Sequence, residues 1–404
     1  MIKIEKPRIE SGVRLVSYVV NEKMPLHEDL WFEVGEEYGQ YLCDEVCDAF
    51  VVAMLIPAVQ TQQDIECDCI SEKLLYNLDK IVSYLLQTAW NCKRIKIKAN
   101  KIVCSNYHGS GVGTGCSLGI DSFASVFAHS DKYCTTSYCL THLTNFNVGA
   151  FGSKDPVLAR ESWRNDLKKV KLFAEEYGLP LVTVDSNLGT TNNNLGFDAV
   201  FLFRNAAAVL SLQKLFGRYF IASGRTAKTI KLSKGDVSCY ESLLVPLFST
   251  ESCDLILSEG DMTRVDKTKF VCETPYVKKH LYVCWKEIFK NEWPNYWKDI
   301  KDYAEKYRNC TRCNKCMRTC LTLDLLGCLD DYKDIFDLPQ YYKTRDGYIK
   351  KVLAYKNGDS IMDDIYKLML EKQYPIPFSA KIGAYAIRLK AVLQGLINKI
   401  ICHK

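Results

Sequence analysis

Three cysteines stand three residues apart in the segment that follows residue 309. Cys310, Cys313 and Cys316 form a Cys-x2-Cys-x2-Cys run on a polar stretch, a spacing that is hard to explain by packing of small apolar side chains. Thiolates at this spacing can surround one cation, and a fourth ligand from elsewhere in the chain completes a tetrahedron. We take Cys284 as this fourth ligand. The four residues predict a closed zinc site, which is a structural rather than a catalytic kind of site.

A second interpretation of the same run replaces Cys284 with Cys320. The run that ends at Cys320 has the Cys-x2-Cys-x2-Cys-x3-Cys spacing of bacterial ferredoxins, which hold iron–sulfur clusters. The ferredoxin run is followed by proline, whereas an apolar helical stretch over 321–326 follows Cys320 here. We therefore favour zinc over an iron–sulfur cluster, and we keep unliganded thiols as a third interpretation.

A glycine-rich stretch from Gly111 to Ser122 leads into an apolar segment over 123–127. Its simplest geometry is a buried strand ending at Cys116, a tight turn, and a helix that starts near Asp121. Such a turn directs free backbone N–H groups and the positive end of a helix dipole at one point, where an anion can bind. It is not a Walker loop, because no Gly-Lys-Ser or Gly-Lys-Thr follows at the required spacing. An ordinary turn capped by Asp or Ser is the alternative interpretation.

Strand and helix patterns alternate from residue 111 to about residue 224. The pattern predicts strands over 111–116, 136–145, 181–185 and 219–223, and helices over 122–130, 156–177 and 198–216. This alternation indicates an α/β fold with a parallel sheet, in which ligands bind beyond the C-terminal ends of the strands. The turn at residues 117–122 lies at such an end, as do Asn145, Ser223 and Gly224.

The segment Ser-Leu-Gly-Ile-Asp-Ser over 117–122 resembles the pyrophosphate loop of the PP-loop ATPase superfamily, whose usual form is Ser-Gly-Gly-x-Asp-Ser after a strand. Ser117, Gly119, Asp121 and Ser122 match, and Leu118 stands where the family has glycine. The resemblance implies that the loop holds the β and γ phosphates of ATP while a substrate oxygen attacks the α phosphate. The products are an adenylated substrate and pyrophosphate.

An upstream cysteine followed by the Cys-x2-Cys-x2-Cys run, in a chain with such a loop, is similar to 7-cyano-7-deazaguanine synthase-like proteins, which bind zinc through such a quartet. The resemblance implies a role for each matching position. Asp121 would place the Mg²⁺-bound phosphates, and Arg264 and Lys267 would stabilise charge on the α phosphate. The nucleotide would be held by Ser117, Gly119, Ser122, Ser223 and Gly224.

Four regions are expected along the chain. They are an N-terminal α+β region (1–105), a PP-loop (HUP-like) ATP-binding α/β domain with a parallel sheet (106–280), a zinc-binding four-cysteine segment (281–328) and a helical C-terminal region (329–404). Within them, residues 225–258 are expected to form a mobile active-site loop, and residues 281–285 are expected to form a strand. The last helix, over 379–404, has an apolar stripe and only basic charges, and we expect it to dock on the protein.

The expected function is that of an ATP-dependent, ligase-like enzyme that adenylates a carboxylate or carbonyl oxygen for attack by a nitrogen nucleophile. The alternatives are a tRNA thiolase, which would use an iron–sulfur cluster or a persulfide, and a non-catalytic nucleotide-binding scaffold, which Leu118 would suit. The expected partners are ATP and a substrate that is a small molecule, a nucleobase or a protein. A homodimer and a role in anti-phage defence are compatible with the resemblance.

Composition limits the class of protein. The 404 residues carry a net charge of only +5, too little for a dedicated nucleic-acid binder. The 19 cysteines are scattered, and the first residues do not resemble a secretory signal. These features predict reduced thiols in a cytoplasmic protein without a membrane partner.

Overall fold

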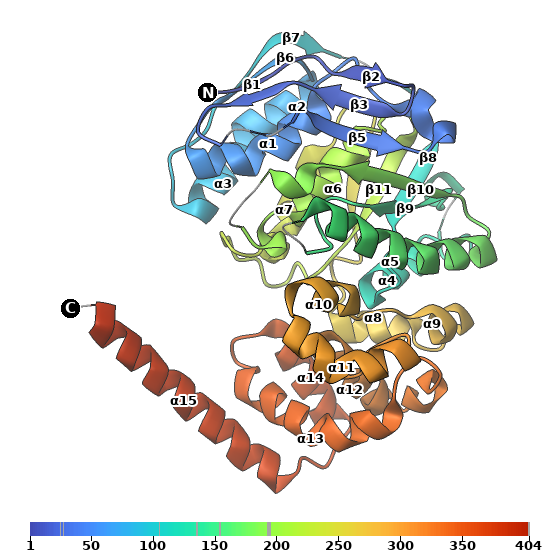
Figure 1. The fold of residues 1–404 in the computed structure, drawn as a ribbon, viewed down its shortest axis with the longest axis vertical. Helices are drawn as coiled ribbons and strands as arrows, with labels where there is room; N and C mark the ends of the chain where they lie inside the picture. The colour runs from blue at the N-terminus through green and yellow to red at the C-terminus, as the bar shows by residue number, and fades with distance from the viewer. Residues whose placement is uncertain are drawn as a thin grey trace. The chain divides into compact units, whose positions relative to one another are not determined.

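The computed structural model describes residues 1–24, 26, 28–104, 106–134, 136–152, 155–191 and 195–402. Residues 403–404, the end of the last expected helix, lie outside them. The chain divides into two compact units, shown in Figure 1. The first consists of Met1–Ser117 and Asp121–Asp261, and the second consists of Leu118–Ile120 and Met262–Lys404.

The first unit is built on an eight-stranded sheet in which five neighbouring strands are parallel. In sheet order these five are β12 (Asp254–Ser258), β11 (Phe216–Ala222), β8 (Gly111–Gly115), β9 (His142–Phe146) and β10 (Leu181–Ser186). Read from β10 to β12 and numbered along the chain, the order is 3-2-1-4-5, so the order reverses between β8 and β11. The predicted α/β alternation with a parallel sheet is confirmed.

Local sequence explains why these elements form. A Cβ atom on Gly113 of β8 would lie 2.7 Å from the Phe216 ring and 2.9 Å from the Tyr219 ring, so glycine leaves room for the aromatic side chains of β11. The connecting helices are α4 (Ile120–Ala128), α5 (Pro156–Tyr177) and α6 (Phe201–Leu210). Helix α5 begins at an Asp155 cap that accepts two backbone N–H groups, and it ends at Gly178 with φ +79°. Helix α6 is shorter than predicted, since it ends at Leu210 and is followed by turns before β11.

Three N-terminal strands join this sheet, whereas the other N-terminal strands form a second sheet. Strands β5 (Leu30–Val34), β3 (Arg14–Ser17) and β2 (Arg8–Glu10) continue the sheet antiparallel from β10. A second sheet has the order β4 (Val19–Asn21), β1 (Ile2–Ile4), β6 (Ile65–Ser71) and β7 (Ile97–Val103). Helix α1 (Asp48–Thr61) packs on β1, β6 and α6, while α2 (Glu72–Asn77) and α3 (Ser83–Trp90) follow β6. One apolar core runs through both sheets.

The segment expected to be a mobile loop, 225–258, is largely packed. Its middle forms short helical turns over 237–239 and 245–248 around α7 (Glu241–Leu244). Five apolar side chains of this stretch are buried in the core: Val237, Tyr240, Leu244, Val245 and Phe248. The expectation of a mobile loop is therefore wrong for residues 237–248.

The second unit is helical. Its helices are α8 (Arg264–Val271), α9 (Pro275–His280), α10 (Lys286–Glu292), α11 (Pro294–Lys306), α12 (Asn314–Leu326), α13 (Leu338–Tyr355), α14 (Ser360–Glu371) and α15 (Phe378–Cys402). Residues 281–285, expected to be a strand, pair with no strand. Helix α12 begins at Asn314, seven residues before the expected start. Among the described residues, no helix combines the length and the apolar character needed to cross a bilayer.

Candidate functional site

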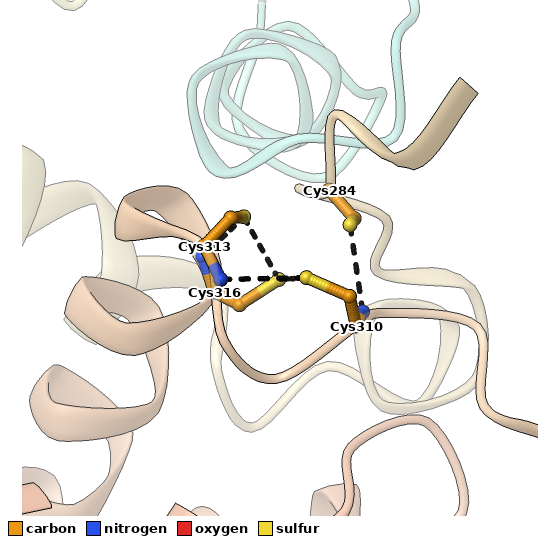
Figure 2. A group of neighbouring side chains, drawn as sticks. All are labelled: Cys284, Cys310, Cys313 and Cys316. Carbon is orange, nitrogen blue, oxygen red and sulfur yellow. Dashed lines mark hydrogen bonds between the residues drawn. The ribbon is translucent and has the colours of Figure 1, made fainter. Parts of the chain in front are cut away.

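Four cysteine sulfurs of the second unit meet at one buried point (Figure 2). The Sγ atoms of Cys284, Cys310, Cys313 and Cys316 all lie within 4.8 Å of one another, and all four residues are buried. The Sγ atom of Cys316 is 3.8 Å from that of Cys310 and 3.4 Å from that of Cys313. A zinc ion with Zn–S bonds of about 2.3 Å holds its tetrahedral sulfurs about 3.8 Å apart. The four thiols therefore fit a single tetrahedral metal ion such as zinc.

Backbone turns position these sulfurs. Cys313 is the N-cap of α12, and its Sγ accepts the N–H of Cys316 at 3.5 Å. In the same way Cys310 Sγ accepts the N–H of Cys313, and Cys284 Sγ accepts the N–H of Cys310, both at 3.4 Å. N–H groups directed at sulfur stabilise thiolates, which are the form that binds metal.

Asn309 joins the two segments that carry the cysteines. Its Oδ1 atom accepts the N–H of Val283 at 2.9 Å, and its Nδ2 atom donates to the carbonyl of Leu281 at 3.0 Å. Asn309 is fully buried. A buried amide with partners on both segments holds residues 281–284 beside the cysteine turn.

The electrostatics of the cluster favour a cation. Hydrogen bonds from the Cys284, Cys310 and Cys316 thiols hold the pKa of Cys313 well below its ordinary value. Burial raises the pKa of Cys284 and of Cys316 well above the ordinary value. Four buried sulfurs cannot all ionise without a compensating charge, and a divalent cation supplies that charge.

Cys320 lies outside the cluster. It is buried on α12 one helical turn after Cys316, and it is not among the four sulfurs that meet. The structure thus selects the quartet with Cys284 over the ferredoxin-like quartet with Cys320. An iron–sulfur cluster contains several irons and would spread its thiolates further apart than a single ion does.

The turn at 117–122 connects β8 to α4. Ser122 Oγ accepts both the N–H and the hydroxyl of Ser117, each at 3.3 Å. Gly119 comes directly before α4, and Asp121 lies in its first turn. Leu118, which stands where the family has glycine, has φ +61° and is buried. A non-glycine residue in this left-handed conformation costs about 1–2 kcal/mol.

A second segment holds the middle of this turn. The backbone N–H of Tyr282 donates to the Leu118 carbonyl at 2.8 Å, a hydrogen bond within the second unit, which includes Leu118–Ile120. Tyr282 lies two residues before the cluster member Cys284. This contact could not be predicted from sequence, because a backbone N–H is present whatever the residue type.

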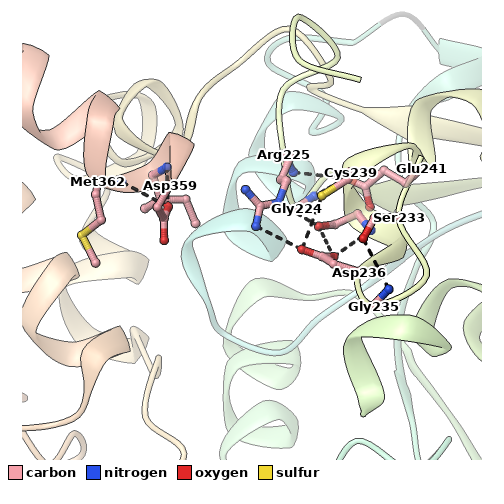
Figure 3. A network of polar contacts seen from close by, with 11 residues as sticks. Gly224, Arg225, Ser233, Gly235, Asp236, Cys239, Glu241, Asp359 and Met362 are labelled. Carbon is pink, nitrogen blue, oxygen red and sulfur yellow. Dashed lines mark hydrogen bonds and ion pairs between the residues drawn. The ribbon is translucent and has the colours of Figure 1, made fainter. Parts of the chain in front are cut away.

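Strand β11, which pairs with β8, ends directly before Ser223 and Gly224, two of the residues predicted to hold the nucleotide. The Ser223 hydroxyl donates to the Glu259 carbonyl at 2.9 Å. The buried Glu241 carboxylate accepts the N–H of Gly224 at 2.7 Å and that of Arg225 at 3.1 Å, as Figure 3 shows. The turn after β11 is therefore held by an internal carboxylate. Sequence reasoning missed Glu241, although a single acid next to an apolar run is the signal that could have found it.

The Arg225 side chain closes the same network. Its guanidinium contacts Asp236 Oδ2 at 3.0 Å (Figure 3). It also donates to Ser238 Oγ at 3.1 Å. The nearby lysines that could neutralise phosphates, Lys228, Lys231 and Lys234, are exposed. This network fixes the backbone that follows β11.

The remaining predicted residues divide between the units. Asn145 has a structural role. Its Nδ2 atom donates to the Cys116 carbonyl and its Oδ1 atom accepts the indole N–H of Trp163, both at 2.8 Å. Arg264 and Lys267 lie on α8 of the second unit, behind a capping box formed by Thr263 and Asp266. Lys267 is buried.

Comparison with known proteins adds no relative: no family model, no curated protein and no solved structure significantly matches this chain.

Proposed function

We propose that this protein is an ATP-dependent enzyme of the PP-loop type, which transfers AMP to a carboxylate or carbonyl oxygen that a nitrogen nucleophile then attacks. One observation carries the proposal. The Ser117–Ser122 turn follows the middle strand β8 of a parallel sheet with the order 3-2-1-4-5, next to the point where the order reverses. In open α/β sheets, ligands bind beyond the strand ends at that point.

The chemistry of the turn suits a phosphate ligand. The N-terminus of α4 carries the partial positive charge of the helix dipole and its first backbone N–H groups. The Ser117 and Ser122 hydroxyls lie together there. In the proposed mechanism these groups hold pyrophosphate, and Asp121 orients the Mg²⁺-bound phosphates. Magnesium, when bound, would neutralise charge on the phosphate oxygens.

The four-cysteine cluster supports the proposed assignment to the PP-loop type. We give the cluster a structural role and no role in catalysis. A closed four-thiolate site leaves no open position for a substrate. In the proposal Cys284, Cys310, Cys313 and Cys316 hold zinc, which fixes residues 281–284 against the cysteine turn. The single-ion spacing of the sulfurs favours zinc over the iron–sulfur cluster on which one form of the tRNA thiolase alternative depends.

The test is an assay with labelled ATP that separates AMP and pyrophosphate from ADP and phosphate. Wild-type protein with Mg²⁺ and a substrate mixture should release AMP and pyrophosphate. Asp121→Asn should lower that rate by about 100-fold or more, because it removes the carboxylate that orients the Mg²⁺-bound phosphates. Asp131→Asn, at an exposed acid just after the same helix, is the matched control and should keep the wild-type rate. ADP as product, or full activity of Asp121→Asn, would contradict the proposal.

A second candidate, a nucleotide-binding scaffold without turnover, is favoured by Leu118. Its buried side chain and left-handed backbone replace the glycine of the family loop. Titration of wild-type protein with ATP distinguishes the two. Binding of ATP that never yields AMP, with every candidate substrate class present, would assign the scaffold function.

A further inference from the structure

Helix α15 presents an exposed apolar stripe. Positions 378, 382, 385, 389 and 393 recur at three- and four-residue spacing, which places them on one face of the helix. Their exposed fractions are 76% for Phe378, 56% for Ile382, 74% for Tyr385, 63% for Leu389 and 51% for Leu393. The expectation that the apolar stripe of this helix docks on the protein is therefore wrong for Ile382, Leu389 and Leu393. Aligned large apolar side chains in water mark an interaction surface.

The opposite face of α15 is the one that packs on the protein. Ala380 and Ala384 are buried, and the helix contacts α13. The Arg388 guanidinium donates to the carbonyls of Leu353 and Ala354, in the last turn of α13, where the helix dipole is negative. This anchoring orients the stripe away from α13. Figure 1 shows that α15 is one long helix whose C-terminal part extends beyond the other helices of its unit.

The charged residues of α15 are all of one sign. No Asp or Glu follows Glu371 in the sequence, whereas Lys381, Arg388, Lys390 and Lys399 all belong to α15. Lys381 and Lys390 are exposed. A second copy of the same helix would bring lysine against lysine, so self-pairing is disfavoured. An anionic partner would complement this surface.

We propose that α15 lies flat on an anionic lipid bilayer, with its apolar stripe in the headgroup region and its lysines on the lipid phosphates. A bilayer interface suits this surface, since the stripe is continuous over the described turns and its one polar group is the hydroxyl of Tyr385, a side chain type that is common at membrane interfaces. An aromatic and aliphatic face combined with polar positions whose charges are all basic is the composition of interfacial helices. The proposal places the protein on the membrane surface and does not depend on the ATP reaction. It departs from the expectation of no membrane partner.

Vesicle co-sedimentation of the full-length protein tests the proposal. The probe is vesicles made of equal parts phosphatidylglycerol and phosphatidylcholine, compared with vesicles of phosphatidylcholine alone. Wild-type protein should pellet with the anionic vesicles, should stay in solution with the neutral ones, and should be released by added salt.

Two variants separate the contributions of the stripe and the charges. Ile382→Glu combined with Leu389→Glu should weaken vesicle binding at least about tenfold. Both side chains are exposed, so the fold has no reason to fail. Lys381→Glu combined with Lys390→Glu should weaken binding to anionic vesicles as well. The matched control is Leu172→Glu, which changes an equally exposed leucine on α5 and should bind like wild type.

Three results would overturn the membrane proposal. Wild-type protein that stays in solution with anionic vesicles would overturn the proposal, as would unchanged binding by the Ile382 and Leu389 double variant. Ultracentrifugation without lipid provides a further check. A dimer that disappears in this double variant would assign the stripe to a second copy of the chain and would also overturn the proposal.

Discussion

At the scale of single residues, Leu118 combines two opposing effects. Its left-handed backbone costs about 1–2 kcal/mol, while its side chain is buried. Removing the side chain should cost about 2–5 kcal/mol, so Leu118→Gly should still destabilise the protein. Leu118→Ala loses the same side chain and keeps the backbone strain. The glycine variant should therefore be more stable than the alanine variant by about 1 kcal/mol, the reverse of the usual order.

Urea unfolding of the two Leu118 variants measures this difference. An alanine variant as stable as the glycine variant would show that the backbone at this position is unstrained. Improved ATP binding by Leu118→Gly would add that leucine restricts the loop, whereas unchanged binding would show that it does not.

The choice between Cys284 and Cys320 is also a matter of single residues. Both cysteines are buried, yet only Cys284 belongs to the cluster. Cys284→Ala should abolish stoichiometric zinc, and Cys320→Ala should retain about one zinc per chain. Elemental analysis of the purified variants gives the answer. Zinc that survives Cys284→Ala and is lost in Cys320→Ala would reverse the ligand assignment.

At the scale of elements, sequence patterns predicted most of the parallel strands because buried strands are short apolar runs between turns. The same reasoning failed at 281–285. This run is apolar, but its N–H groups pair with Asn309 and with the Leu118 carbonyl instead of with a strand. It also placed the start of α12 too late, because Cys313 caps the helix through its sulfur and a cysteine is not among the usual N-cap residues.

Helix α14 contains an aspartate, Asp364, whose pKa is raised by its surroundings. Burial raises the pKa of Asp364 from its ordinary value of 3.8 to about 6, and Asp363, Asp266 and Asp359 add to the rise, while Lys367 opposes it. A raised folded-state pKa means that the protonated carboxyl stabilises the fold. This contribution is complete below the unfolded pKa near 3.8 and is lost as the pH rises through about 6.

Asp364→Asn should therefore raise the thermal unfolding temperature relative to wild type above about pH 7, and the difference should shrink towards about pH 4. Melts followed by circular dichroism at several pH values measure it. The exposed Asp334→Asn variant should show no such trend. A gap that is constant with pH would mean that Asp364 titrates normally.

At the scale of the whole molecule, the order of strands could not be predicted. Which strand neighbours β8 depends on pairings between residues far apart in the chain, such as Tyr219 with Gly113. For the same reason the N-terminal strands could not be assigned to the central sheet. Three of the four clustered cysteines followed from spacing alone, whereas the contacts of Glu241 and Tyr282 depend on tertiary structure that no local pattern encodes.

The metal cluster and the loop are connected through one short segment, which leads to a prediction for the whole molecule. Cys284 lies two residues after Tyr282, whose N–H holds the Leu118 carbonyl at 2.8 Å. Removal of metal by a chelator should remove the bonds that hold the four sulfurs at one point, so residues 281–284 should loosen and release Leu118. Hydrogen exchange should then rise in peptides covering 281–285 and 117–122, and ATP affinity should fall although no loop residue has changed.

The chelator experiment has an internal control in the cysteine variants. Cys320→Ala, which keeps all four cluster sulfurs, should respond to chelation like wild type. Cys284→Ala, which we expect to lack zinc, should already exchange quickly and should not change further. If stripped wild-type protein kept its slow exchange over 117–122, the Tyr282 hydrogen bond would not depend on the metal, and the loop would be held by its own serine contacts and by the buried Leu118 side chain.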